Sequence, residues 1–141
     1  MMYDKILIPV DGSIGSERGI EYGLDIAQQH GSTVHALYVV DQRIYGDTPA
    51  LSSDELFYEQ LEESGESILQ TVEERANDMG LDAVSVCKRG MPDEVILSYA
   101  NEQGIELIVM GQHGRSPLHH PHAGSCTDRV TQRSRVPVRS V

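Results

Sequence analysis

The sequence predicts an α/β fold, a five-stranded parallel sheet with helices on both faces, and three observations carry this prediction. Five short apolar runs alternate with stretches of helical length along the 141 residues. The apolar runs are nearly continuous, as expected of strands buried on both faces of a parallel sheet. Glycine follows three of the helical stretches, where a left-handed residue commonly ends a helix. The length fits one domain, which we place over residues 1–141.

The elements follow one another in a regular β-α order. The predicted strands are residues 5–10, 33–40, 83–88, 107–110 and 136–141. The predicted helices are residues 14–30, 52–79, 90–104 and 125–134. Ser52 or Ser53 is expected to cap the long second helix, whose glutamates form a solvated face. Pro92 suits the first turn of the third helix, beside acids that the helix dipole favours.

The charge is strongly acidic, with 22 Asp and Glu against 11 Lys and Arg and a formal net charge of −11. This excess argues against nucleic acid or an anionic membrane as the main partner. Only two of the 11 basic residues are lysines, which is typical of proteins from a high-salt cytoplasm, so we expect a salt-loving organism. The chain has no signal-peptide pattern and no apolar run of about 18 residues, which predicts a cytoplasmic protein.

The charge is unevenly distributed along the chain. Residues 111–141 contain five arginines and one aspartate, a net charge of +4, which leaves −15 for residues 1–110. The basic segment either meets a small anion or neutralises part of the protein's own acidic surface.

Glycines follow the fourth predicted strand. Gly111 and Gly114 stand three residues apart, and Gly124-Ser125 opens the last helix. Glycines at a strand end let the backbone approach a ligand, and a helix start offers N–H groups to an anion. Arg115 adds positive charge to this loop. The segment therefore suits a polyphosphate, although it is neither a Walker A loop nor a dinucleotide fingerprint, and a tight turn explains the glycine pair equally well.

These residues resemble the universal stress protein family over essentially the whole chain, from K-I-L-I-P-V-D-G-S through E-L-I-V-M-G-Q-H-G-R-S to G-S-C-T-D-R-V and R-V-P-V. The nucleotide-binding branch of that family has the motif G-2x-G-9x-G-(S/T), and this chain matches its spacing with Gly111, Gly114, Gly124 and Ser125. The resemblance implies a Rossmann-like fold of the adenine-nucleotide alpha-hydrolase type, with strand order 3-2-1-4-5 and ATP, or ADP or AMP, at the switch point.

The resemblance also implies roles for individual residues. The implied nucleotide-binding residues are Pro9, Val10, Asp11, Val39, Met110, Gly111, Gly114, Arg115, Gly124, Ser125 and Cys126. The first three lie against the adenosine, Val39 meets the adenine through its backbone, and Met110 and Gly111 line the same side. Gly114, Gly124, Ser125 and the backbone of Cys126 hold the phosphates. Asp11 is expected near the ribose, the phosphates or a nucleotide-bound Mg²⁺. As an alternative, Asp11 caps a turn or a helix after its strand.

The nine-residue spacer departs from the family pattern. It contains Pro117 and Pro121 and the histidines His119, His120 and His122, where the family usually has a more apolar anchor. Imidazole binds zinc, copper or nickel, so a metal site is one interpretation of this loop, and a solvated pH-sensitive loop is the other.

Three functions remain open from the sequence. The first is an ATP-binding regulatory protein of the stress response with slow or no hydrolysis, since no nucleophile–base pair is apparent. The second is a Mg-dependent ATP-hydrolysing or nucleotidyl-transfer enzyme on the same fold, and the third is a nucleotide-free interaction module. The resemblance implies a homodimer paired through strand 136–141 and an unidentified regulatory protein partner.

Overall fold

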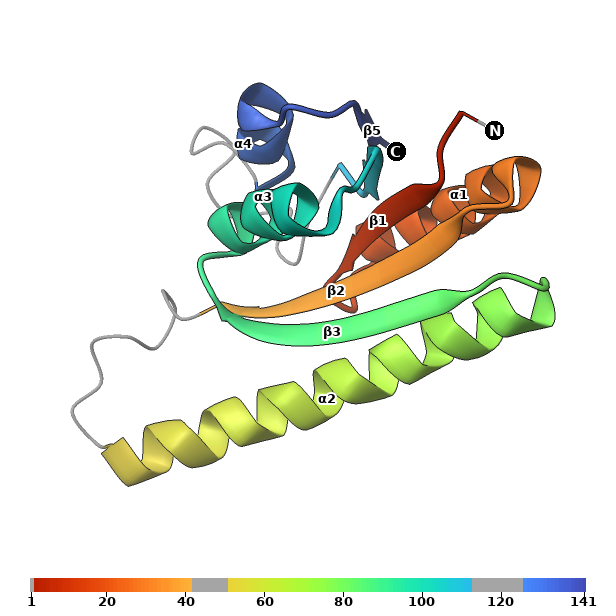
Figure 1. Cartoon of the computed structure of the whole chain (residues 1–141). Coiled ribbons are helices and arrows are strands. Elements are labelled where there is room, and N and C mark those ends of the chain that lie inside the picture. The colour runs from red at the N-terminus through yellow and green to blue at the C-terminus, as the bar shows by residue number, and fades with distance from the viewer. Residues whose placement is uncertain (1, 42–50, 113–125) are drawn as a thin grey trace.

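The computed structural model describes residues 2–41, 51–112 and 126–141, and the side chains of all of these except residues 51–54. The strands are β1 (Lys5–Val10), β2 (Thr33–Asp41), β3 (Ala83–Gly90), β4 (Leu107–Met110) and β5 (Val138–Ser140). The helices are α1 (Ile14–His30), α2 (Leu51–Asp78), α3 (Pro92–Gln103) and α4 (Cys126–Arg133). All strand pairs are parallel, and the order β3-β2-β1-β4-β5 confirms the predicted sheet (Figure 1).

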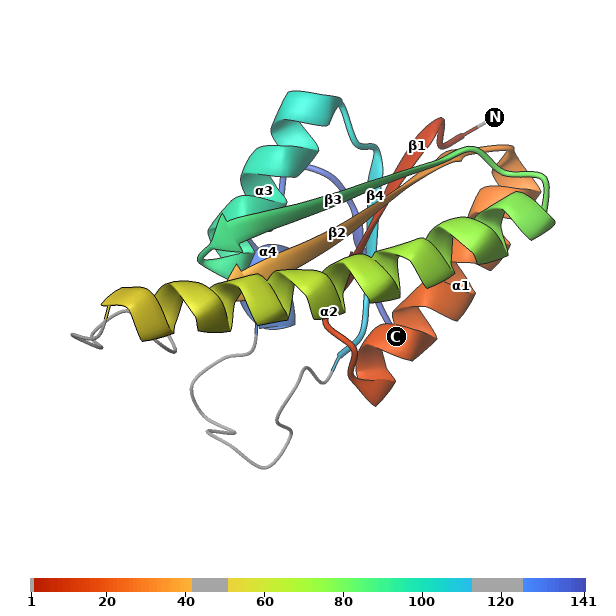
Figure 2. The same ribbon diagram turned by 90° about the horizontal axis from the view of Figure 1, so that it is seen from below.

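Helices cover both faces of this sheet. In Figures 1 and 2, α1 and α2 lie on one face, and α3 and α4 lie on the other. Successive strand residues point to opposite faces, so Ile6 and Ile8 pack with α1 and α2, whereas Leu7 packs with α3 and α4. Burying one such side chain contributes about 1.5–3 kcal/mol, and this explains the unbroken apolar runs of the sequence.

Several predicted boundaries differ from the structure. Strand β3 continues to Gly90, so α3 begins at Pro92 instead of residue 90, and two further boundaries are wrong for local reasons. Helix α2 begins at Leu51, so Ser52 and Ser53 belong to its first turn instead of preceding it. A serine suits either position, so its presence does not decide where the helix starts. Strand β5 covers only Val138–Ser140 of the predicted range 136–141. The hydroxyl of Ser134 accepts the N–H of Val136 at 3.1 Å and donates to its carbonyl at 2.8 Å, which folds this residue into a turn.

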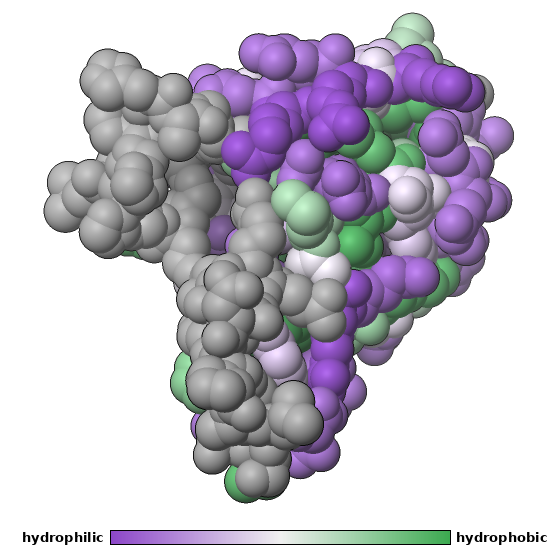
Figure 3. Space-filling view, turned by 90° about the vertical axis from the view of Figure 1, so that its left-hand side faces the viewer, coloured by the Kyte–Doolittle hydropathy of each residue, from purple (hydrophilic) through white to green (hydrophobic). Residues whose placement is uncertain are grey.

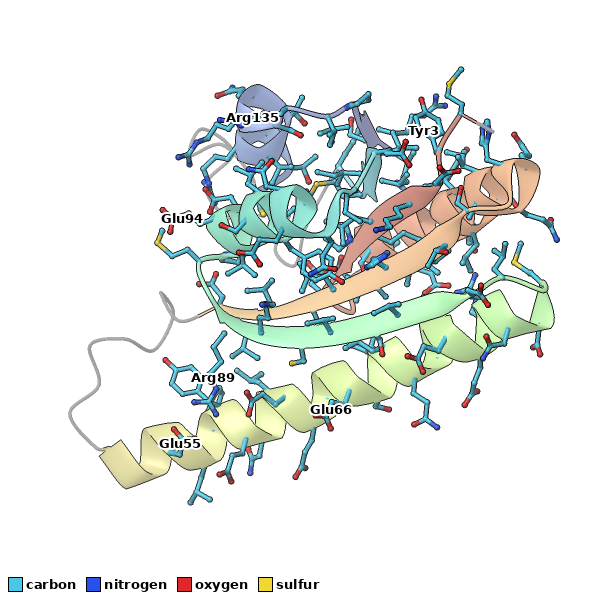
Figure 4. The ribbon with its side chains drawn as sticks, viewed as in Figure 1. Tyr3, Glu55, Glu66, Arg89, Glu94 and Arg135 are labelled. Carbon is cyan, nitrogen blue, oxygen red and sulfur yellow. The ribbon has the colours of Figure 1, made fainter. Side chains whose placement is uncertain are left out.

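The expected solvated face of α2 is wrong at its contact with β3. Glu62 lies 2.8 Å from Arg89 Nε, and Glu55 lies 2.9 Å from another nitrogen of the same guanidinium (Figure 4). Arg89 also lies over the ring of Tyr58, 5.2 Å from its centroid. The hydrogen bonds from Arg89 lower the pKa of both glutamates. The end of β3 therefore holds the first turns of α2 against the sheet.

A polar pair is buried between β2 and α3. The Nδ1 atom of His35 lies 2.7 Å from the hydroxyl of Tyr99, and both side chains are buried. Desolvation, with a smaller effect of the Lys5 charge, lowers the pKa of His35. The expectation that both residues pack in the core is confirmed, and the hydrogen bond explains how their polar atoms are accommodated.

We expect His35 to make the stability of the fold depend on pH. Because its folded pKa lies below the ordinary value of 6.5, the unfolded chain takes up this proton first as the pH falls. The free energy of unfolding should decrease as the pH falls from about 6.5. Urea unfolding between pH 7.5 and 5.5 should show a weaker decrease for His35→Gln than for the wild type. His30→Gln is the control, and an unchanged slope in His35→Gln would contradict the assignment.

Candidate functional site

The candidate site lies at the carboxyl edge of the sheet, between β1 and β4. The chain leaves β1 for α1 on one face of the sheet, and α4, which follows β4, covers the other face (Figure 1). In doubly wound sheets, a crevice forms where two adjacent strands send their connections to opposite faces. The residues that follow β1 and β4 therefore face a common opening.

Pro9 explains why β1 and β4 separate at this point. The carbonyl of Asp4 accepts from Thr33 beside β2, and the carbonyl of Lys5 accepts from Glu106 beside β4. By this alternation the backbone nitrogen of Pro9 faces β4, where it has no hydrogen to donate. The registered pairing of the two strands ends earlier, at Leu7 with Ile108. A proline is tolerated inside this central strand because its missing donor falls on the side of the crevice.

A compact hydrogen-bond network shapes the turn after β1. An oxygen of Asp11 accepts the N–H of Ser13 at 2.9 Å, and the N–H of Asp11 donates to the hydroxyl of Ser16 at 3.0 Å. Ser13 caps α1 by accepting the N–H of Ser16 at 3.1 Å. The structure thus assigns Asp11 the turn-capping role that the sequence left open. A carboxylate has two oxygens, so this bond leaves the second one for a ligand.

Helix α1 packs against the end of β4 through glycines. A Cβ atom on Gly111 would overlap the backbone of Gly15, and a Cβ on Gly19 would lie 3.2 Å from the N of Gly111. A Cβ on Gly23, one turn further, would lie 2.5 Å from Ile8. The spacing of four residues puts the three helix glycines on one face of α1. Gly111 is consequently required by steric contact as well as by any ligand.

The start of α4 is attached to the same point. The hydroxyl of Thr127 donates to the carbonyl of Gly111 at 2.6 Å in a buried contact. The two ends of the intervening segment are thereby held together beside the crevice. Cys126 is half-buried at the first position of α4. Thr127 was not among the residues predicted from the sequence, although a hydroxyl residue in the first helical turn after Gly124-Ser125 was an available signal.

The remaining predicted residues divide between the faces of the sheet. Val39 and Met110 are buried on the α3 and α4 face, and strand alternation puts Pro9 on that face too. Val10 instead packs in the core beneath α1 and α2, so the prediction that it lies against the adenosine can apply only to its backbone. The strict alternation of side chains along β1 causes this difference. Gly114, Arg115, Gly124 and Ser125 lie outside the described residues.

The opposite face carries a second, shallow opening. It lies between α1 and α2, and its lining includes Ser13, Thr71 and the ion pair of Glu17 with Arg75 at 2.6 Å. Figure 3 views the carboxyl edge, where strongly hydrophilic side chains gather on the side of the molecule that carries α4. The shallow opening therefore lies on the α1 and α2 face of the sheet, away from α4.

Metal ligands do not converge in the part of the chain that the structure describes, where no cluster of three His, Cys, Asp or Glu occurs. The histidines of the spacer, His119, His120 and His122, lie outside those residues. The described helices also include none with the length and apolarity that a membrane span requires.

The parallel strand order, with helices on both faces, defines a doubly wound α/β protein. A model of the universal stress protein family matches residues 2–141, and the chain belongs to this family. The family indicated by the sequence motifs is thus confirmed.

Individual relatives show the same similarity. Universal stress protein MJ0531 of Methanocaldococcus jannaschii is 34% identical over 137 residues, which cover 97% of this chain and 81% of that protein. The structure of hypothetical protein MJ0577 from the same organism has a TM-score of 0.88 at 27% identity, covering 100% of this chain and 96% of that chain. A universal stress protein in complex with cAMP shares the fold, with a TM-score of 0.78, 21% identity and coverage of 100% and 98%.

We expect Gly111→Ala to destabilise the fold strongly, because its Cβ meets the backbone of Gly15, which cannot rotate away. The loss of unfolding free energy should reach about 3 kcal/mol, the upper range for overpacking. Gly104→Ala is the comparison, since its Cβ meets nothing within 4 Å. The loss of unfolding free energy then comes only from placing alanine at a φ of 66°, which costs about 1–2 kcal/mol. Urea unfolding measures both variants, and equal losses would refute the steric argument.

Pro9→Ala should restore a donor on the β4 side of β1. The new N–H is expected to pair with β4 and to become protected from hydrogen exchange. The stability should change by less than about 1 kcal/mol, because a gained hydrogen bond offsets the lost restriction of the unfolded chain. Amide exchange and urea unfolding test this, and a rapidly exchanging Ala amide at this position would show that another feature separates the strands.

Proposed function

We propose that this protein binds an adenine nucleotide, ATP or its products ADP and AMP, and acts as a nucleotide-dependent regulatory module of the stress response. The observation that supports this most directly is the junction at Gly111. This glycine packs on α1 and accepts the hydroxyl of Thr127, which holds together the two ends of the segment that carries Gly114, Gly124 and Ser125. The complex of a universal stress protein with cAMP supports an adenine ligand for this fold.

In this proposal the two sides of the crevice have different tasks. Val39 and Met110 offer apolar surface to the adenine at the carboxyl ends of their strands. The glycine segment, with Arg115 and the N–H groups that begin α4 at Cys126, takes the phosphates. The second oxygen of Asp11 faces the ribose or a Mg²⁺ ion. A hard oxygen donor suits Mg²⁺, which would supply positive charge beside the phosphates.

Regulation by occupancy fits the site better than rapid chemistry. Asp11 is the acid of the predicted set, and its carboxylate already accepts the N–H of Ser13. The predicted set contains no nucleophile–base pair, so we propose slow hydrolysis or none. A Mg-dependent ATP-hydrolysing or nucleotidyl-transfer enzyme is the second candidate, because the same residues would position a phosphate chain.

We also propose an oligomeric state, a cellular location and a habitat for this protein. Strand β5 is an outer strand of the sheet, and its free edge suits a homodimer paired through residues 136–141. Only Val138–Ser140 is extended, and Val136 and Val138 pack partly on the chain's own core, so the paired edge would be short. We further propose one domain over 1–141, a cytoplasmic location, an unidentified protein partner and a salt-rich habitat.

Nucleotide binding is tested on the purified protein at several molar KCl. Mass spectrometry identifies what co-purifies, and thermal shift and calorimetry measure ATP binding. A free ATP concentration 100 times Kd should add about 2.7 kcal/mol to the stability of the wild type. Gly114→Val should lose this stabilisation, whereas Gly104→Ala, at the opposite edge of the sheet, should keep the wild-type Kd.

Two other outcomes would redirect the assignment. Absence of stabilisation by millimolar ATP in the wild type favours the nucleotide-free interaction module. Rapid Mg-dependent turnover that disappears in Asp11→Ala favours the enzyme. Unchanged ATP binding in Gly114→Val would contradict the phosphate role of the glycine segment.

A further inference from the structure

Asp93 is an unusual carboxylate in this structure. It occupies the first turn of α3, where acids normally stay in water close to the positive end of the helix. Its exposure is only 2%, and no other Asp, Glu, Lys or Arg appears among the buried polar residues that the structure describes. Its sequence neighbour Glu94 is exposed, as expected at such a position (Figure 4). Burial of a carboxylate costs free energy, so its surroundings require an explanation.

Two arginines of α4 face one oxygen of this carboxylate. Oδ2 of Asp93 lies 3.4 Å from Nε of Arg129 and 3.3 Å from a terminal nitrogen of Arg133. These arginines are four residues apart and therefore share one side of α4. The other oxygen, Oδ1, is buried with no hydrogen-bond partner among the described residues. The pair is thus half-satisfied, and its contacts are longer than the 2.7–2.9 Å of strong charge-assisted bonds.

Helix α4 is a short element that packs on α3 and β5. Its eight residues span about 12 Å and contribute two fully or nearly buried side chains, Thr127 and Val130. Thr127 ties its first turn to Gly111, while Asp93 holds the side that carries the two arginines. The ion pair with Asp93 is thus one of the contacts that orient α4. The first residue of α4 follows directly on Gly124-Ser125 in the sequence. The orientation of α4 therefore sets how the N–H groups at its start face the crevice.

We propose that Asp93 is a positioning residue that orients α4, through Arg129 and Arg133, for recognition of the phosphate groups. The inference rests on the proposed nucleotide function only for the identity of the ligand. A buried carboxylate whose second oxygen has no donor among the described residues is a costly way to join two helices, and apolar residues of similar volume often replace such ion pairs without loss of stability. Unlike apolar packing, the ion pair fixes the orientation of α4, because a charged hydrogen bond restricts how the helix can rotate about its axis. Asp93 does not touch the ligand in this arrangement and acts through the helix.

The test compares Asp93→Asn with Glu94→Gln, which makes the same charge change at the adjacent exposed position. Hydrogen exchange of the peptide 126–133 is measured without nucleotide, and Kd is measured for ATP and for adenosine. Asp93→Asn should raise exchange in α4 and weaken ATP binding about tenfold, with little effect on adenosine. Glu94→Gln should leave all three values unchanged.

The outcomes separate this inference from the proposed function. If the wild type binds neither ligand, the proposed function fails, and the exchange of α4 alone decides the role of Asp93. Unchanged exchange in Asp93→Asn, or an equal loss of affinity for ATP and adenosine, would overturn the positioning role. Should Asp93→Asn fail to fold, Arg133→Gln, whose parent side chain is 57% exposed, provides the second variant. It should raise exchange in α4 and raise the ratio of the ATP Kd to the adenosine Kd in the same direction.

Discussion

The close approach of α1 to the end of β4 is the contact on which the rest of the site depends. Gly111 and Gly15 meet backbone to backbone, so Gly111 has no room for a side chain and α1 cannot move closer to β4. This contact sets where the chain leaves the sheet after β4. The same residue accepts the hydroxyl of Thr127, which brings the start of α4 to that point. A single glycine thus joins a helix on one face of the sheet to a helix on the other.

Beside this junction, β1 and β4 separate because the backbone of Pro9 has no N–H group. Pro9 cannot donate a hydrogen bond to β4, and the pairing of β1 with β4 stops at Leu7, two residues before Pro9. The opening therefore lies next to the apolar side chains of Val39 and Met110 and beside the Asp11 turn. Three local features, a missing N–H, a missing Cβ and a capped turn, come together because the sheet order brings them to the same edge.

Much of the fold could be predicted from the sequence, because its signals are local. Apolar runs and glycine stops placed every strand and helix, and the errors at Ser52, Ser53 and Val136 concern where an element begins. The error at Glu62 is of another kind, because Arg89 of β3 pairs with this residue of the predicted solvated face. For the site, the chain positions after β1, β2 and β4 were predicted, but not how individual side chains point. Val10 faces the α1 and α2 core, and Asp11 caps a turn, because alternation along a strand and hydrogen bonding in a turn depend on the surrounding packing.

By itself, the sequence determined the order of the elements, the buried character of the strands and the spacing of the glycine motif. Hydrophobic periodicity and glycine placement are properties of short stretches of chain and do not depend on distant residues. Only the tertiary structure decided that Asp93, which the sequence places in an ordinary helix start, is buried against Arg129 and Arg133 from the last helix. Contacts between residues about 40 positions apart arise when two helices pack on the same face of a sheet, and no local pattern records that packing.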